Sequence, residues 1–364
     1  MNSETNAVPK KCRFFLPGLL LAVFLLMALQ RLLMPKYLGK VVEGNFTGEY
    51  YRETAPHQLL ILGDCEAYEN ISPVTLWRNY GISSYIRGNA NQLPVQSYYL
   101  LKEALETETP KVVLFSVSAL QERAQTNETY NRMTLDGMRW SGLKAMAVRD
   151  SKLPDEYYIE YIFPLLRFHD RWKELNGDDL RFFLPGSVPA VTHNGYYLRA
   201  DIRPAGELPP ARRLADPMLP ASSVEWLDRI REICEEKNIT LVLFKAPSIL
   251  PVWYEEWDAQ IREYAFVHGL MYVNCLADSS AAGIDYSRDT YDGGMHMNVY
   301  GAEKVADHLG AFLVKNGCVS DQRGDPLLQD LYSAKAEVYD RIKKEQENEF
   351  AELGYLRQFS DSAD

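Results

Sequence analysis

Short apolar runs alternate with longer segments of mixed polarity over most of the chain. An apolar run of about four to eight residues that ends at a turn residue is typical of a strand buried on both faces of a parallel sheet. HQLLILG and KVVLFSV are two such runs. The pattern predicts five strands, at residues 57–63, 83–89, 111–117, 239–247 and 270–276.

The segments between these runs carry apolar residues at helical spacing. The pattern predicts helices at residues 72–81, 94–106, 224–238, 254–269 and 299–317. Strands that alternate with helices indicate a parallel sheet with helices on both faces, because right-handed crossovers lay each helix against the sheet. We therefore expect a three-layer α/β domain over residues 57–318, with its reactive groups at the carboxyl ends of the strands.

Two segments depart from this alternation. Residues 120–221 separate the third predicted strand from the next helix and are rich in Tyr, Trp, Arg and Pro. Connections this long tend to be functional, so we expect an inserted cap over the site. Residues 319–364 contain a charged amphipathic stretch, which predicts a helical tail that packs on the domain or on a partner.

An apolar segment at residues 14–34 lies near the N-terminus. No small-residue cleavage pattern follows it, which favours an uncleaved transmembrane signal anchor over the alternative, a cleaved secretory signal peptide. Basic residues precede the segment, and the positive-inside rule then keeps residues 1–13 in the cytoplasm. We expect a single-pass protein of the cell membrane, in which residues 35–56 link the anchor to an extracellular domain.

Charge and cysteine content exclude several classes of function. The chain carries 39 Lys and Arg against 50 Asp and Glu, a formal net charge of −11, whereas a nucleic-acid partner requires a basic face. The five cysteines form no CxxC pair, and no cluster of Cys and His has the spacing of zinc ligands. The sequence therefore predicts no nucleic-acid partner, no disulfide framework, no metal and no cofactor.

Two distant segments carry candidate catalytic residues. Cys65 directly follows the first predicted strand, and Asp292 and His296 lie just before the last predicted helix. Nucleophilic catalysis needs a thiol or hydroxyl close to a base, and a third group that orients the base. Cys65 is the candidate nucleophile, His296 the candidate base and Asp292 the candidate carboxylate that orients the base. The alternatives are a small buried cysteine at Cys65 and a helix-capping histidine at His296.

The GDC segment after the first strand, with an Asp and a His near the last helix, resembles the SGNH/GDSL hydrolase superfamily. The resemblance covers about residues 57–118 and 239–316. The single anchor and external domain are similar to the cell-surface subset that includes the D-alanyl-lipoteichoic-acid biosynthesis protein DltD and partners of membrane-bound O-acyltransferases. The resemblance implies a flavodoxin-like fold in which Gly88, after the second strand, helps to hold an oxyanion, with Asn91 as a neighbouring donor.

The chain departs from the superfamily pattern at three places. Cys65 replaces the usual Ser, Asp292 and His296 are one residue further apart than usual, and FSVSAL lacks the expected Asn after the third strand. A thiol is a few per cent ionised at neutral pH, and a nearby imidazole can hold it active. A thioester on Cys65 is a competent acyl donor to a hydroxyl, which suits transfer as well as hydrolysis.

Polar and aromatic residues near the predicted site are candidates for substrate binding, through Arg forks and an aromatic face. They are Asn131, Arg132, Arg139, Trp140 and Asn298. Salt bridges that anchor the cap are the alternative for the cluster within the insertion. Lys245, at the end of the fourth predicted strand, either faces the site or is solvated.

The resemblance implies acyl transfer or ester hydrolysis on cell-surface polymers, which means O-acylation or deacylation of glycans or teichoic acids. The expected partners are an acylated cell-surface polymer or lipid-linked glycan, a membrane-bound O-acyltransferase, and the membrane itself. The main alternative is a non-catalytic protein of the same fold that binds an acylated polymer or docks onto the acyltransferase. A carbohydrate esterase without partners is a third hypothesis.

Overall fold

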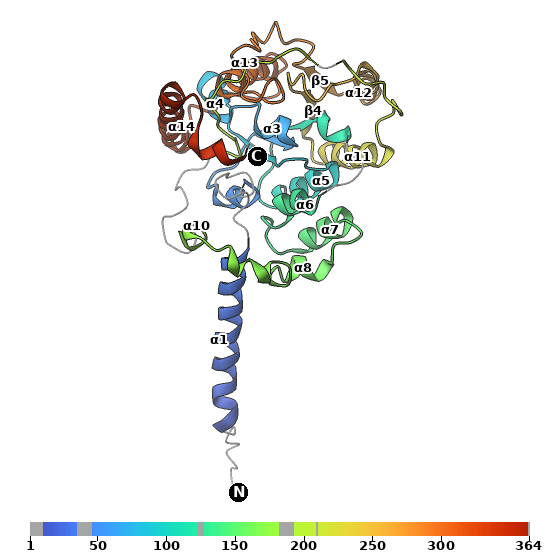
Figure 1. Ribbon diagram of the computed structural model, residues 1–364. Helices are drawn as coiled ribbons and strands as arrows, with labels where there is room; N and C mark the ends of the chain where they lie inside the picture. The colour runs from blue at the N-terminus through green and yellow to red at the C-terminus, as the bar shows by residue number, and fades with distance from the viewer. Residues whose placement is uncertain (1–9, 35–45, 122–126, 182–192, 209, 363–364) are drawn as a thin grey trace.

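The chain forms an α/β domain from which one long helix projects (Figure 1). The computed structural model describes residues 10–34, 46–121, 127–181, 193–208 and 210–362. The projecting helix is α1 (Lys10–Leu33). Its window Leu16–Leu33 has a mean hydropathy of 2.0, and most of its side chains are exposed. By length and composition α1 can span a membrane, as predicted for residues 14–34.

Five parallel strands form one sheet in the described part of the domain. They are β1 (Leu59–Gly63), β2 (Ser84–Gly88), β3 (Val112–Ser116), β4 (Thr240–Lys245) and β5 (Met271–Asn274). The strand order is β2-β1-β3-β4-β5, so the five predicted strands and their parallel arrangement are confirmed. In this doubly wound order the winding reverses between β1 and β3, and ligands of such sheets bind at the carboxyl ends of the strands there.

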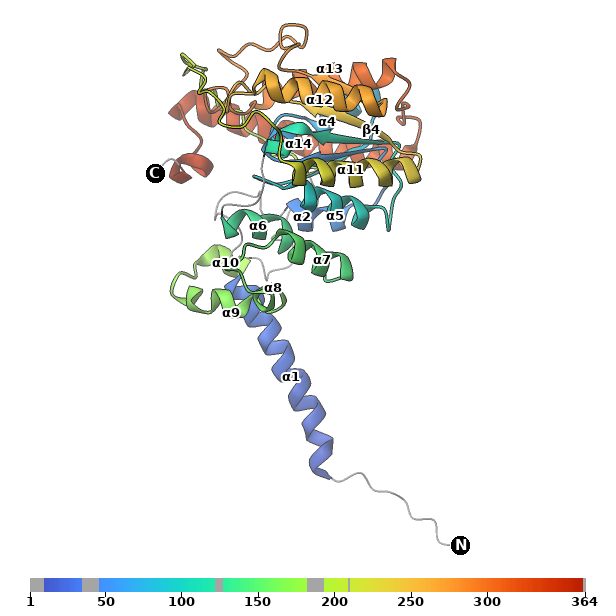
Figure 2. The same cartoon turned by 90° about the vertical axis from the view of Figure 1, so that its right-hand side faces the viewer.

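The sheet is the middle of three layers because successive side chains of a strand point to opposite faces. On β1, Leu59 and Ile61 pack under one set of helices, and Leu60 and Leu62 pack under the other set. The first set is α4 (Pro73–Tyr80) and α13 (Val299–Lys315), and the second is α5 (Pro94–Ala104), α11 (Ala221–Glu236) and α12 (Glu255–His268). Figure 2 shows the sheet between these helices, which confirms the predicted helices and the α/β class.

The segment between β3 and α11 has a helical part and a coil part. Its helices pack against α5, against α2 (Phe46–Glu49) and against the end of α1 (Figure 2). They are η3 (Val117–Gln121), α6 (Glu128–Leu135), α7 (Gly142–Ser151), α8 (Tyr158–Ile162), α9 (Leu165–Phe168), η4 (His169–Lys173) and α10 (Gly177–Arg181).

Within the described residues of this insertion, it is the coil part that lies beside the predicted catalytic segment. The backbone N–H of Arg203 donates to the Thr290 carbonyl at 2.9 Å, and that of Ala205 donates to the Tyr286 carbonyl at the same distance. The helices extend instead toward α1, on the side of the domain that carries α5. The predicted cap over the site is therefore limited to this coil.

Both ends of the α/β domain add structure to it. After α1, the helices α2 and η2 (Tyr50–Arg52) pack on the domain, and the Tyr50 hydroxyl donates to the Glu108 carboxylate at 2.6 Å. At the other end, α14 (Pro326–Leu353) stacks Tyr332 on Trp77 with ring centroids 4.3 Å apart. A last short helix, η5 (Arg357–Ser362), follows. Of the two predicted alternatives for the tail, packing on the domain is therefore the one observed.

Candidate active site

Cys65 begins the short helix α3 (Cys65–Tyr68), directly after β1. The turn requires glycine at position 63, where φ is +146° and an added Cβ would lie 2.5 Å from the Cβ of Ser116. The side chain of Asp64 then accepts a hydrogen bond from the Glu66 N–H at 3.2 Å and caps α3. The GDC segment thus places a half-buried thiol at the carboxyl end of β1, next to β3.

Asp292 and His296 lie on the loop between β5 and α13 and are hydrogen-bonded to each other. One oxygen of Asp292 is 2.6 Å from Nδ1 of His296, and the other accepts from the His296 backbone N–H at 2.9 Å. Gly293 and Gly294 have φ of +88° and +105°, in the left-handed region that favours glycine. The two glycines let the chain reverse between Asp292 and His296, so the longer spacing still brings the carboxylate onto the imidazole.

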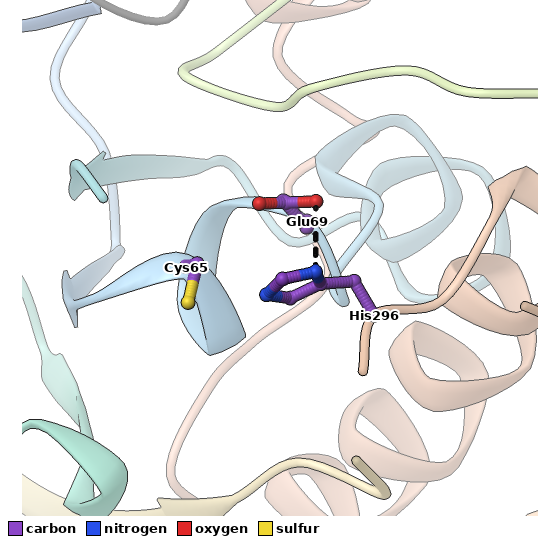
Figure 3. Close-up of side chains that lie close together, drawn as sticks. All are labelled: Cys65, Glu69 and His296. Atoms are coloured by element: carbon purple, nitrogen blue, oxygen red, sulfur yellow. Dashed lines mark ion pairs between the residues drawn. The ribbon is translucent and has the colours of Figure 1, made fainter. Parts of the chain in front are cut away.

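The fold brings Cys65 and His296 face to face (Figure 3). The sulfur of Cys65, a ring nitrogen of His296 and a carboxylate oxygen of Glu69 all lie within 4.8 Å of one another. In Figure 3, Nδ1 of His296 faces Glu69, and the other ring nitrogen, Nε2, is directed toward the sulfur. Because Asp292 holds Nδ1, a thiol, an imidazole and an orienting carboxylate stand in the order that nucleophilic catalysis requires.

Glu69 is a second carboxylate at this imidazole, and sequence reasoning missed it. It is 3% exposed and forms an ion pair with His296, with 3.5 Å between its Oε2 and Nδ1. The hydroxyl of Tyr291 donates to the same oxygen. The available signal was its position four residues after Cys65, which puts both on one side of a helical turn.

The protonation of the pair follows from burial and from the two carboxylates. Burial raises the pKa of the Cys65 thiol to about 12, although His296 opposes the rise. Burial alone would lower the pKa of His296, but Glu69, Cys65 and the hydrogen bond with Asp292 raise it well above its ordinary value. The thiol and the imidazole therefore each hold a proton to higher pH than the free side chains do, and the two groups titrate as a coupled pair.

Asp64 lies beneath the site and is bound by two serines. Its Oδ1 accepts from the hydroxyl of Ser118 at 2.7 Å and from that of Ser116 at 3.2 Å. Burial, together with Glu66, raises the pKa of Asp64 to about 6. Ser116 and Ser118 belong to the FSVSAL segment that lacks the expected Asn, so this segment ties β3 to the Cys65 turn through hydroxyl groups instead.

Lys245 is buried next to the Cys65 turn, so the predicted alternative of a solvated side chain is wrong. It is 1% exposed, and its Nζ lies 2.7 Å from Oε1 of Glu66. The Ala246 N–H donates to the other oxygen of Glu66 at 3.2 Å. The ion pair fastens the end of β4 to α3 and neutralises the charge next to Cys65.

Asn70 fastens the loop of His296 to the Cys65 side of the site. Its Oδ1 accepts from the backbone N–H of Met297 at 2.6 Å, and its Nδ2 donates to the Ser248 hydroxyl at 3.2 Å. The side chain is fully buried. Since Met297 directly follows His296, this amide helps to determine where the imidazole lies.

The two predicted oxyanion residues lie at the end of β2 and after it. Gly88 pairs with Gly63 in the sheet, and an added Cβ would approach the Gly63 carbonyl oxygen to 2.9 Å. Asn91 is half-buried, with φ of +49°, in the turn that follows. The side chain of the neighbouring Asn89 is directed toward α2, because its Nδ2 donates to the Thr47 hydroxyl at 3.0 Å. Gly88 is thus next to the Cys65 turn, and its role toward an oxyanion stays a prediction.

Two of the five predicted substrate-binding residues are buried inside the insertion. Asn131 is fully buried, donates to the Ser151 carbonyl at 2.9 Å and accepts from Gln96 Nε2 at 2.9 Å. Arg132 is 3% exposed, pairs with Glu128 at 2.5 Å and lies over the ring of Tyr161. These contacts match the alternative of salt bridges and hydrogen bonds that anchor the insertion.

The other three predicted substrate-binding residues also contact the protein itself. Arg139 is exposed, with its guanidinium 4.2 Å from the ring centroid of Tyr51, and the ring of Trp140 lies against Lys144. Asn298 is fully buried and caps α13, since its Oδ1 accepts from two N–H groups of the first turn. The observed contacts of the five residues are thus structural, and only Arg139 and Trp140 retain a large exposed surface.

Cys65, Glu69 and His296 also form a candidate metal site. Thiolate, imidazole and carboxylate are all zinc ligands, and three protein ligands are typical of catalytic zinc. Metal ligands are commonly hydrogen-bonded to a second group that orients them. Two of the three have such a group: Asp292 for His296 and Tyr291 for Glu69. Their spacing in the chain is not that of zinc ligands, because the three residues meet only through folding.

Among known proteins, the chain matches no protein-family model and no curated protein. The resemblance to the SGNH/GDSL superfamily therefore depends on the motifs of this chain.

Proposed function

We propose that the protein is an extracytoplasmic, SGNH-like acyltransferase or esterase that uses a cysteine nucleophile. The sulfur of Cys65 attacks the acyl carbonyl carbon while His296 takes the thiol proton. His296 then gives that proton to the departing alcohol, and a thioester remains on Cys65. An acceptor hydroxyl or water attacks the thioester, His296 takes its proton, and the thiol is restored.

The observation that carries this proposal is the arrangement of Cys65, His296 and Asp292. The thiol faces Nε2 of His296, and the Asp292 carboxylate lies 2.6 Å from Nδ1. This hydrogen bond directs Nε2 toward the sulfur and stabilises an imidazolium during the reaction. The position of the site, at the carboxyl end of β1 where the sheet reverses its winding, supports a binding function.

The substrate class and the location follow from the resemblance and from α1. We propose that α1 anchors the chain in the cell membrane with its N-terminus in the cytoplasm, so that the domain acts outside on acylated glycans or teichoic acids. A membrane-bound O-acyltransferase is the proposed source of the acyl group, and an acylated polymer or lipid-linked glycan is the proposed substrate. The apolar window Leu16–Leu33 supports the anchoring step.

Hydrolysis of an activated ester by the purified full-length chain tests the mechanism. We expect Cys65→Ala to reduce kcat/KM by roughly 10³-fold or more, since it removes the nucleophile. Cys234→Ala is the matched control, because Cys234 is 1% exposed inside the core and lies in α11. Mass spectrometry after rapid acid quenching should find the acyl group on the peptide that contains Cys65. A Cys65→Ala variant as active as the parent would falsify the mechanism.

The non-catalytic alternative predicts binding of an acylated polymer without turnover. Alkylation of the full-length chain by iodoacetamide separates the two hypotheses. We expect Cys65 to react faster as the pH rises through the first proton loss of the Cys65–His296 pair, and the His296→Ala variant to lose this step. If Cys65 is inert at every pH while the polymer still binds, the non-catalytic alternative is correct.

A zinc enzyme is the second candidate function, and it rests on the same three ligand atoms within 4.8 Å. Its test is loading with Co²⁺, whose thiolate complex absorbs strongly in the near ultraviolet. Absorption that is lost in Cys65→Ser and weakened in Glu69→Gln would support a metal-bound thiolate. Full esterase activity after exhaustive chelation, with no cobalt–thiolate absorption, would instead support the free nucleophile.

A further inference from the structure

Six large apolar side chains are exposed in one short stretch of the insertion. The stretch comprises α8, α9, η4 and the start of α10, and we call it the juxtamembrane segment, residues 157–180. The six are Tyr157, Ile159, Phe163, Leu166, Trp172 and Leu180, each between 46% and 68% exposed. Single exposed apolar residues are ordinary, but so many in about two dozen positions indicate a surface that contacts something apolar.

This segment is joined to the end of α1 (Figures 1 and 2). The helix packs against α9, η4 and α10, and its Leu33 is 3% exposed. The guanidinium of Arg171 donates to the carbonyls of Leu33 and Met34 at 3.1 and 3.2 Å, so it caps the carboxyl end of α1. The segment is therefore fixed to the anchor by direct contacts.

The length of α1 determines where that contact lies relative to a bilayer. The apolar window has 18 residues, which at about 1.5 Å per residue span roughly 27 Å, close to the hydrocarbon thickness of about 30 Å. The whole window is needed to cross the hydrocarbon, so little of this helix can extend beyond it. Its last residue, Leu33, packs against the segment. If α1 spans the membrane, as the proposed function requires, the segment must lie at the level of the headgroups.

We propose that the juxtamembrane segment lies in the outer interface of the lipid bilayer, with its exposed apolar side chains among the acyl chains. Short helices that lie in the plane of a membrane bury an apolar face about 5 to 10 Å deep in this way. Trp and Tyr are enriched at that level because their rings are amphipathic, and Trp172 and Tyr157 are the most exposed of the six. Arg167 and Lys173, which pair with Glu128 and Asp170, are exposed in the same segment, where long basic side chains can reach the headgroups.

The consequence is a fixed orientation of the catalytic domain. The domain has two attachments to the bilayer, α1 and the juxtamembrane segment, so it cannot rotate freely about a single linker. The Cys65 site is then held at a constant height above the membrane. This arrangement suits a substrate that is itself attached to the membrane, such as a lipid-linked glycan or polymer.

Quenching by brominated lipid tests the proposal on the full-length chain in phosphatidylcholine vesicles. The described residues of α1 contain no Trp, so quenching by bromines on the acyl chains reports on the domain. We expect Trp172→Phe to remove at least half of the quenchable fluorescence. Trp257→Phe is the matched control, because Trp257 lies on α12 among Trp253 and Tyr254, and it should leave the quenching unchanged.

A second pair of variants separates a contact with lipid from a contact with another protein. Phe163→Ser combined with Leu166→Ser should reduce the quenching of Trp172, whereas Phe266→Ser, at a site 84% exposed on α12, should not. The proposal is overturned if Trp172 is quenched by aqueous iodide and not by brominated lipid. It is also overturned if Trp172 is shielded only when a partner membrane protein is added. Release of the whole chain by alkaline carbonate would overturn the insertion of α1 itself, and with it the proposed location.

Discussion

At the scale of single residues, His296 is distinguished by contact with two carboxylates. Asp292 binds its Nδ1 at 2.6 Å and Glu69 lies 3.5 Å from the same nitrogen. Burial opposes ionisation of Asp292, but the hydrogen bond and charge of His296, with two backbone N–H groups of the loop, hold the pKa of Asp292 below its ordinary value. Glu69 comes from the Cys65 side of the site. A substitution of Glu69 therefore alters the protonation of the imidazole without altering the loop that carries Asp292 and His296.

We predict that Glu69→Gln moves the acid limb of kcat/KM to lower pH. The Glu69 carboxylate favours the imidazolium and raises the pKa of His296, so its removal lowers that pKa. The singly protonated Cys65–His296 pair, which is the reactive form, then appears at lower pH. A pH–rate profile checks the shift.

Glu263→Gln, at an exposed position of α12, is the control and should leave the profile in place. A Glu69→Gln profile that coincides with the parent would show that Glu69 does not tune His296. Lower activity at every pH without a displaced limb would indicate a purely structural role.

We predict that Asn70→Ala lowers both stability and turnover. The variant leaves the buried N–H of Met297 without its acceptor, which costs about 1–3 kcal/mol. Because the next residue along is His296, the loss also loosens the imidazole and reduces kcat. Denaturant unfolding and ester hydrolysis measure the two effects, with Asn79→Ala, at an exposed position of α4, as the control. Unchanged unfolding and unchanged kcat in Asn70→Ala would contradict the role assigned to this amide.

The sequence predicted the three central site residues but not the residues around them. Cys65, Asp292 and His296 stand directly after a strand or before a helix, where doubly wound folds gather reactive groups. Glu66 and Lys245 are 179 positions apart, and nothing local marks them as a buried pair. Asn298 was predicted to bind substrate, but it caps α13. The sequence does not distinguish the two roles, because a polar residue next to a site serves equally well as a helix cap.

At the scale of elements, the strands were predictable because each is buried on both faces. Each predicted strand is two or three residues longer in total than the observed one, as at His57 and Gln58 before β1. These two polar residues are buried. His57 lies 3.0 Å from Glu108 through its side chain, and Gln58 still makes backbone hydrogen bonds to Ser83, Lys111 and Val112. Apolar continuity therefore locates a strand, whereas its ends depend on distant partners that the sequence does not show.

We predict that Tyr332→Ala in α14 destabilises the domain by about 3–5 kcal/mol, the usual cost of truncating a large buried aromatic residue. Tyr332 is 1% exposed, stacks on Trp77 and accepts from the Ser84 N–H at 2.9 Å. Denaturant unfolding gives the change in free energy. Tyr355→Ala, at a position 49% exposed after α14, should change it by less than about 0.5 kcal/mol. Equal effects of the two substitutions would show that α14 is a peripheral tail.

At the scale of the whole molecule, α1 contributes almost nothing to the hydrophobic core of the domain. Among the described residues of α1 whose side chains are placed, Leu33 alone belongs to the buried hydrophobic set. We therefore predict that a chain truncated to residues 46–364 unfolds with the same midpoint as the full chain in detergent. It should also hydrolyse a soluble ester at the same rate, because α1 packs on α9, η4 and α10, whereas Cys65, Glu69 and His296 meet at the carboxyl end of β1.

The same truncated chain should still bind to phosphatidylcholine vesicles, although weakly. The juxtamembrane segment remains exposed in it, and burial of Phe163 and Trp172 is worth about 1.5–3 kcal/mol for each side chain that leaves water completely. Vesicle sedimentation measures the binding, which Phe163→Ser with Trp172→Ser should abolish and Phe266→Ser should not. High salt should weaken it little, because the attraction is apolar rather than ionic. Strong salt dependence, or equal binding by all three chains, would show that the domain meets the membrane through another surface.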